Sequence, residues 1–356
     1  MARGILIFGS AGAGKRTLGD AVARELGFAH INTDDLFWRT GMKYPYTLML
    51  PREDRKIKLV DAIWTQTNFV LSGNLDTISD ITAPDASFEI FGQQFRFPFF
   101  AGPVGAVVSH YGDQHNDKSY NNILVKACAE AGIAAFTGDG LDSTVMEVAC
   151  EAIAAANGKG VPTVKPWNLE TIETKMRTVK ASGAFAVAMD IDAAGLPFLK
   201  GMTPPAGAKS TEQLAEIARM SGKPFIVKGF MTVRGALKAR EAGAAAIVVS
   251  NHGGRVLDQC PATAEVLCEI ADALKGTGMK IFVDGGIRTG VDVFKALAMG
   301  ADAAIICRPF VPMVYGGGEE GVRLYIDRIG AELEDTMAMC GAATLADIRR
   351  DMIFTR

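Results

Sequence analysis

The sequence predicts an α/β protein whose larger part is a (β/α)8 TIM barrel, preceded by a shorter β-α-β-α-β segment. About eight short apolar runs, each followed by a helix-length segment, recur over roughly 260 residues, which is the size and repeat number of such a barrel. Residues 4–75 show a separate alternation of strands and helices before these repeats begin. We therefore divide the chain into a segment of residues 1–74 and a barrel of residues 75–356.

In the first segment, apolar runs and helical periodicity predict strands at 4–8, 29–31 and 68–71 and helices at 15–26 and 52–66. In the barrel, the predicted strands cover 99–103, 134–137, 163–165, 184–189, 225–228, 245–249, 281–283 and 303–306. The longest strand-to-helix connection, residues 192–210, is rich in Gly and Pro. We expect it to lie over the barrel mouth as a lid or to flank a cofactor.

The composition is that of an ordinary globular protein, with 49% hydrophobic and 22% charged residues in 356. Residues 1–75 carry 10 basic and 7 acidic side chains and the remainder 27 and 33, so neither part has the basic excess of a nucleic-acid binder. No apolar run approaches the roughly 20 residues that span a bilayer, and we expect no signal peptide at the start of the sequence. The six cysteines are dispersed without metal-ligand spacing, so we expect no metal site and a reducing, cytoplasmic setting.

Polar side chains gather where the predicted barrel strands end, which is where barrels of this kind build their active sites. The clearest group follows the strand at 245–249, where His252 and Arg255 stand three residues apart on a glycine-rich loop. A histidine can move a proton, and an arginine can hold a carboxylate beside it. By itself such a pair is more often structural, so its meaning depends on the surrounding motifs.

Those motifs resemble the FMN-dependent 2-hydroxy-acid oxidase and dehydrogenase family, the glycolate oxidase and lactate oxidase group. The resemblance covers about residues 75–356. It is carried by four segments, namely Ile226–Gly229, Ser250–Asp258, Val283–Ala301 and Arg308–Pro309.

The resemblance implies oxidation of a small L-2-hydroxy acid to the 2-oxo acid, with FMN as cofactor and O2 or another acceptor reoxidising it. His252 would be the general base, Arg255 would clamp the substrate carboxylate, and Asp192 would orient His252. The residues implied to bind the cofactor are Thr137, Lys228, Ser250, Asp284, Gly286, Arg288, Cys307 and Arg308. The family resemblance also implies a homo-oligomer.

The sequence departs from the family pattern around the substrate. An arginine that often follows the fourth strand is missing from residues 193–200, and Lys165 stands after the third strand, where the family usually has aromatic residues. Lys165 could hold an acidic substrate, or it could pair with Asp139 or Asp190. The sequence leaves these alternatives open.

In the first segment, the loop Gly9–Lys15 follows a strand and begins a helix, as in the P-loop of small nucleotide kinases. Gly9, Gly14, Lys15 and Thr17 are therefore candidate phosphate-binding residues, with ATP and Mg²⁺ as their ligands. However, Arg16 stands where the motif needs the Ser or Thr that holds Mg²⁺. Two alternative functions thus remain: a nucleotide-dependent phosphotransferase, and a flavin-binding barrel without turnover.

Overall fold

The computed structural model describes residues 3–8, 14–37, 50–73, 83–196, 199 and 201–354. The chain forms two compact units, one of residues 1–84 and 337–343 and the other of residues 85–336 and 344–356. The first unit contains β1 (Arg3–Phe8), α1 (Lys15–Leu26), β2 (Ala29–Asn32), α2 (Thr33–Phe37), α3 (Arg52–Trp64) and β3 (Asn68–Gly73). Its three strands are parallel, in the order β1-β3-β2.

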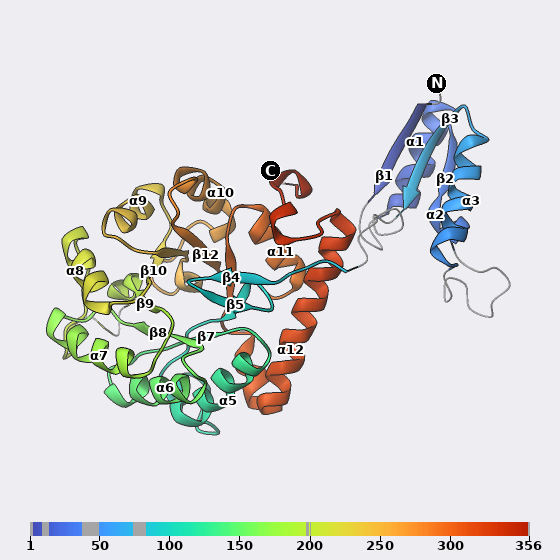
Figure 1. The fold of residues 1–356 in the computed structure, drawn as a ribbon. Coiled ribbons are helices and arrows are strands. Elements are labelled where there is room, and N and C mark those ends of the chain that lie inside the picture. The colour runs from blue at the N-terminus through green and yellow to red at the C-terminus, as the bar shows by residue number, and fades with distance from the viewer. Residues whose placement is uncertain are drawn as a thin grey trace. The chain divides into compact units, whose positions relative to one another are not determined.

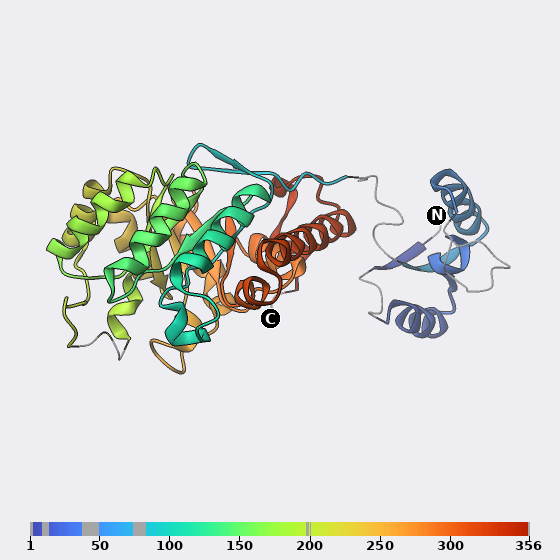
Figure 2. The same cartoon turned by 90° about the horizontal axis from the view of Figure 1, so that it is seen from below.

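In this unit the helices α1 and α3 cover opposite faces of the sheet (Figure 2). Phe69 and Leu71 of β3 pack with Ile31 of β2 against the apolar side of α3. The predicted strands and helices are thus confirmed, although α3 ends at Trp64, two residues earlier than predicted, and the short helix α2 was not predicted.

The second unit is a closed barrel of eight parallel strands, which confirms the predicted fold class. Its strands are β6 (Phe99–Ala101), β7 (Ala135–Thr137), β8 (Gly160–Val164), β9 (Val187–Asp190), β10 (Phe225–Phe230), β11 (Ala246–Val249), β12 (Lys280–Asp284) and β13 (Ala303–Ile306). The α-helices that follow or connect them are α4 (Val107–Tyr111), α5 (Asp117–Glu130), α6 (Ser143–Ala155), α7 (Leu169–Ala181), α8 (Thr211–Ser221), α9 (Val233–Glu241), α10 (Thr263–Leu274), α11 (Gly290–Ala298) and α12 (Phe310–Cys340). The helices surround the strands (Figure 1).

Aromatic side chains fill the barrel interior. The rings of Phe100, Phe136 and Phe282 meet one another with centroids 5.8–6.1 Å apart. A hairpin of β4 (Phe88–Ile90) and β5 (Gln93–Phe95) precedes the first barrel strand, and Phe95 contacts Phe100 edge-on at 5.0 Å. This packing fills the barrel interior, and in such barrels the active site lies at the end where the strands terminate.

Short 3-10 helices follow the strands at two places in the barrel and near its end, namely η2 (Ile191–Gly195), η4 (His252–Gly254), η5 (Leu345–Asp347) and η6 (Arg350–Met352). The predicted lid, residues 192–210, is described except for 197, 198 and 200. Its later part is attached to the loop after β8, because Ala206 forms a β-bridge with Trp167 and Asn168 N donates to Pro205 O. No helix within the described part of the chain is long and apolar enough to cross a membrane.

Candidate active site

A cavity of about 510 Å³ lies at the C-terminal ends of the barrel strands. Loops after seven of the eight strands contribute to its wall, so residues far apart in sequence meet there. Predicted site residues that line it are Lys165, Lys228, His252, Arg255, Asp284, Gly286, Arg288, Cys307 and Arg308. Thr137, Asp192 and Ser250 were also predicted for the site but are not part of the cavity wall.

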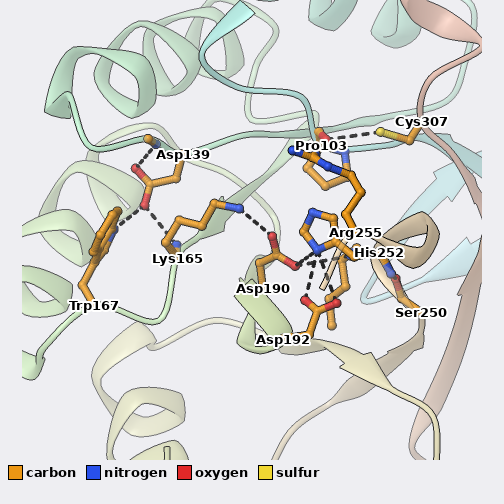
Figure 3. Close-up of polar contacts among 12 residues, drawn as sticks. Pro103, Asp139, Lys165, Trp167, Asp190, Asp192, Ser250, His252, Arg255 and Cys307 are labelled. Carbon is orange, nitrogen blue, oxygen red and sulfur yellow. Dashed lines mark hydrogen bonds and ion pairs between the residues drawn. The ribbon is translucent and has the colours of Figure 1, made fainter. Parts of the chain in front are cut away.

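His252 is positioned by the loop that follows β11. Its backbone φ is 58°, a left-handed conformation that side-chain-bearing residues rarely adopt, and its amide donates to Ser250 Oγ at 3.1 Å. The imidazole Nδ1 lies 3.3 Å from both carboxylate oxygens of Asp192 and 3.5 Å from Asp190 Oδ1 (Figure 3). One ring nitrogen is thus held by two acids, which leaves the other available for proton transfer.

Asp190 is the centre of a row of charges set by strand register. Lys228 on β10 is the direct neighbour of Asp190 on β9, and Val164 pairs with Met189, so Lys165 and Asp190 follow side by side. Lys165 Nζ lies 2.8 Å from Asp190 Oδ2, and Lys228 Nζ lies 3.3 Å from Asp190 Oδ1. Of the two acids that the sequence left open as partners, Asp139 and Asp190, the Lys165 side chain therefore pairs with Asp190.

The two acids beside His252 have opposite pKa shifts. Burial by itself would raise the pKa of Asp190, but the charges of Lys165 and Lys228 hold it well below its ordinary value. Burial raises the pKa of Asp192, and Lys228 and His252 only partly oppose that effect. Environments that separate two carboxyl groups in this way are typical of acid–base sites.

Lys228 is itself almost fully buried. Burial would lower its pKa, but Asp190 and Asp284, whose oxygens lie 3.3 and 3.6 Å from Nζ, raise it above the ordinary value. Lys228 is therefore a permanent cation on the cavity floor.

Within the described ranges, Asp190, Asp192 and His252 are also the one group of three His, Cys or acidic side chains whose donor atoms come close together, within 4.8 Å of one another. Two ammonium groups already neutralise Asp190, which opposes a divalent cation there.

The loops after β12 and β13 form an anion-binding wall. Gly285 and Gly286 have φ values of 91° and 82°, and the space beside Gly286 is open. Arg288 Nη1 donates to the carbonyl of Gly286 at 3.2 Å, and Arg308 lies against Gly253. Two guanidinium groups beside exposed backbone amides suit a phosphate group.

Cys307 belongs to the same wall through its close packing. The Cys307 Sγ donates to Pro103 O at 3.3 Å. The Cβ of Cys307 lies so close to Gly102 that a Cβ added to Gly102 would be only 2.7 Å from it. Burial raises the pKa of the Cys307 thiol to about 11, with a contribution from Asp284.

Three buried polar atoms in or beside the cavity have no hydrogen-bond partner in the protein: Thr137 Oγ1, Thr163 Oγ1 and Asp284 Oδ1. Thr163 and Asp284 line the cavity wall. Thr137 is buried, at 1% exposed, and does not line it. Because buried polar groups are nearly always satisfied, these atoms indicate a polar ligand or ordered water in the cavity.

Sequence reasoning missed a buried network that supports Lys165. Asp139 accepts hydrogen bonds from Lys175 Nζ and Trp167 Nε1, both at 2.7 Å, and from the backbone amides of Gly140 and Lys165 at 2.9 and 3.0 Å. Figure 3 shows Asp139 between Trp167 and Lys165. The Asp139 carboxylate thus joins the loops after β7 and β8. The sequence named Asp139 only as a possible partner of Lys165 and gave no sign of Lys175 on α7.

The mouth also holds residues outside the predicted site. Tyr111 lines the cavity, and His110 Nε2 lies 3.5 Å from Arg255 Nη2. Burial raises the pKa of Tyr111 above its ordinary value. Their position directly after the first barrel strand is the signal in the sequence that could have placed them at the mouth. His115 instead packs on Tyr315 at 4.9 Å.

In the first unit, Gly14 has a φ of 73° directly before α1, and Lys15 and Thr17 stand in the first turn of that helix. Gly9 lies outside the described residues. Arg16, which breaks the P-loop pattern, lies 3.4 Å from Asp35 at the surface. The kinase resemblance is not borne out by the comparisons below, and nucleotide binding stays an untested prediction.

Comparisons with known proteins relate the barrel to flavin enzymes. The chain is 42% identical over 184 residues to a peroxisomal (S)-2-hydroxyacid oxidase of Arabidopsis thaliana, which covers 52% of this chain and 47% of the relative. It is 44% identical over 146 residues to an L-lactate oxidase of a Roseobacter strain, covering 41% and 39%. The matched regions thus span about half or less of these curated relatives.

A crystal structure of mandelate oxidase with benzoylformic acid superimposes with a TM-score of 0.65 at 27% identity, covering 77% of this chain and 83% of that one. The sequence pattern of the FMN-dependent dehydrogenases matches residues 74–201 and 198–355, which is well over half of the chain. This protein therefore belongs to the FMN-dependent dehydrogenase family.

Proposed function

We propose that the barrel oxidises a small L-2-hydroxy acid to the corresponding 2-oxo acid with FMN as its cofactor. The observation that carries the proposal is the placement of His252, held at Nδ1 by two carboxylates, beside Arg255 at the same cavity mouth. A base next to a carboxylate-binding guanidinium is what removal of a proton from a 2-hydroxy acid requires.

The cavity fits FMN, the cofactor that family membership implies. The wall at Gly286, Arg288 and Arg308 suits the cofactor phosphate, and the unpartnered Thr163 and Asp284 oxygens await a polar ligand. The buried cation of Lys228 would stabilise negative charge on a reduced ring. When bound, the isoalloxazine ring supplies a hydride acceptor at N5.

The protein's own residues then have distinct tasks. Arg255 binds the substrate carboxylate through paired hydrogen bonds, and His252 takes the proton at its free ring nitrogen. Asp192 orients the imidazole and stabilises its protonated form, while Ser250 Oγ holds the strained backbone of His252. Thr137 remains a candidate for contact with the cofactor through its unpartnered hydroxyl.

The decisive measurement is the anaerobic visible spectrum of the purified protein before and after addition of glycolate, L-lactate and longer L-2-hydroxy acids. Bleaching of the flavin bands by one of these acids is the expected result. His252→Gln should retain the flavin and lose bleaching, since it lacks the base but conserves side-chain volume. Bleaching at an unchanged rate in this variant would remove His252 from the mechanism.

Three further proposals concern the setting of the enzyme. All six cysteines are free, which supports a reducing compartment such as the cytoplasm, although the Arabidopsis relative is named peroxisomal. O2 or another acceptor would reoxidise the flavin. A homo-oligomer is proposed from family resemblance, and size-exclusion chromatography with light scattering would test it.

A further inference from the structure

Two carboxylates face the same nitrogen of His252, and this creates a difficulty for a base. Asp190 and Asp192 both lie within 3.5 Å of Nδ1, and two anions at that distance favour the protonated imidazole. A protonated imidazole cannot accept the substrate proton. The site therefore needs positive charge that offsets one of the two acids.

Lys165 supplies that charge in a way that Lys228 alone cannot. Asp190 presents its Oδ1 to Lys228 and His252 and its Oδ2 to Lys165, which is the shorter of the two lysine contacts at 2.8 Å. Lys228 is shared with Asp284 at 3.6 Å, so its charge is divided between two acids. With its side chain 14% exposed, Lys165 is shielded from water, and its charge is felt strongly.

Lys165 is also held rigidly for this task. Its backbone amide donates to Asp139 Oδ2, and that carboxylate is fixed in turn by Lys175 and Trp167. The side chain of Lys165 then extends from this anchor across the cavity wall to Asp190 (Figure 3). A rigid backbone anchor is typical of a residue whose side-chain position matters to a site.

We propose that Lys165 is a positioning residue that neutralises Asp190 and so keeps His252 unprotonated and ready to act as the base. The inference rests on the proposed function, because it assigns His252 as that base. The charged and titratable groups placed around His252 from the packed elements are Lys165, Asp190, Asp192, Lys228, Asp284, Arg255, His110 and Arg308. Among them, Lys165 reaches His252 only through Asp190.

The test is a titration of the His252 imidazole in the FMN-loaded protein. The chain has four histidines, so protein labelled with ¹³C at histidine Cε1 gives few resonances, and His252→Gln identifies the relevant one. In Lys165→Met and Lys165→Gln, we expect the titration midpoint of His252 to rise by about one pH unit. Removal of a nearby positive charge makes protonation of the ring easier, which gives the shift its upward sign.

Two control variants test whether the charge of Lys165, and not its shape, causes the shift in the His252 midpoint. Lys165→Arg keeps the charge and should therefore leave the midpoint within about 0.3 units of the unmodified protein. Lys118→Met is the matched control, because Lys118 pairs with Glu151 at an exposed position away from the cavity wall. The two neutral replacements differ in polarity, so one of them suffices if the other does not fold.

A midpoint that stays in place in folded, FMN-loaded Lys165→Met or Lys165→Gln would overturn the proposal, as would an equal shift in Lys165→Arg. The titration uses no substrate, so its outcome is independent of whether any 2-hydroxy acid bleaches the flavin. Where a substrate is found, the acidic limb of the pH profile for flavin reduction should move upward by the same amount.

Discussion

The buried pair of Lys175 and Asp139 offers a sharp test of how the loops after β7 and β8 are held. The Lys175 residue is 8% exposed, and its Nζ lies 2.7 Å from Asp139 Oδ1. Lys175→Met keeps a long apolar side chain but leaves the buried carboxylate without its cation. Removal of one partner from such a pair typically costs about 3–5 kcal/mol.

The structure places this variant at the lower end of that range. Asp139 keeps three neutral donors, from Trp167 Nε1 and from the amides of Gly140 and Lys165. We therefore expect a loss of about 3 kcal/mol in the free energy of unfolding, or roughly 6–12 °C in the melting temperature of a unit this large. Thermal unfolding followed by circular dichroism gives the value, and release of FMN identifies the transition of the barrel.

A control on the same helix separates burial from simple loss of charge. Arg177 on α7 pairs with Glu173 at 3.0 Å, but both side chains are more than half exposed. Arg177→Met should therefore unfold at an unchanged temperature. In the double variant Lys175→Met/Asp139→Asn, the loss should be smaller than the sum of the two single losses. Equal melting temperatures for Lys175→Met and Arg177→Met would refute the reasoning.

Four other predictions concern the substrate clamp, a buried thiol, the central carboxylate and the cavity wall. Arg255→Lys should raise KM for a 2-hydroxy acid about tenfold or more with a smaller change in kcat, because an ammonium cannot form the paired hydrogen bonds of a guanidinium; equal KM values would count against the carboxylate role. Iodoacetamide at pH 8 should modify Cys307 about 100-fold more slowly than a thiol of ordinary pKa, as measured by peptide mapping, since its pKa of about 11 reduces the thiolate fraction. Burial opposes ionisation of Asp190, but its lysine neighbours lower its pKa. The contribution of Asp190 to stability is therefore complete above about pH 4 and is lost as the pH falls further. Between about pH 6 and pH 3, the melting temperature of Asp190→Asn should fall less than that of the unmodified protein. Gly138→Ala would bring a Cβ within 2.5 Å of backbone atoms in the loop after β6 and should weaken FMN binding, whereas Gly207→Ala meets no atom within 4 Å and should leave the measured dissociation constant unchanged.

The barrel could be predicted from the sequence because its signal is repeated. Each strand is a short apolar run, and eight such runs in regular alternation with helices have few other solutions. His252 and Arg255 could be placed for a related reason, since they follow a strand closely enough for the strand end to fix their location. Neither prediction required knowledge of which strands are neighbours.

The sequence named Asp139 and Asp190 as possible partners of Lys165 but could not choose between them, and it gave no partner for Lys175, because both pairings depend on contacts between separate elements. Lys175 stands on α7 in an ordinary amphipathic pattern, 36 residues from Asp139. A lysine in such a helix is usually exposed, and nothing local distinguishes this one. Asp192 was predicted to orient His252 and does approach it at 3.3 Å, but the approach of Asp190 to 3.5 Å became visible only in the folded barrel.

Strand register explains why Asp190 has this central place. Lys165 follows β8, Asp190 ends β9, and Lys228 lies within β10 directly beside Asp190, so the barrel itself sets their order as cation, anion, cation. The loop after β11 then adds His252 from the side, in a backbone conformation that Ser250 helps to hold. The row of charges belongs to the rigid part of the fold, whereas Arg255 belongs to a loop. A change of substrate could therefore proceed through the loops while the electrostatic setting of the base is kept by the barrel.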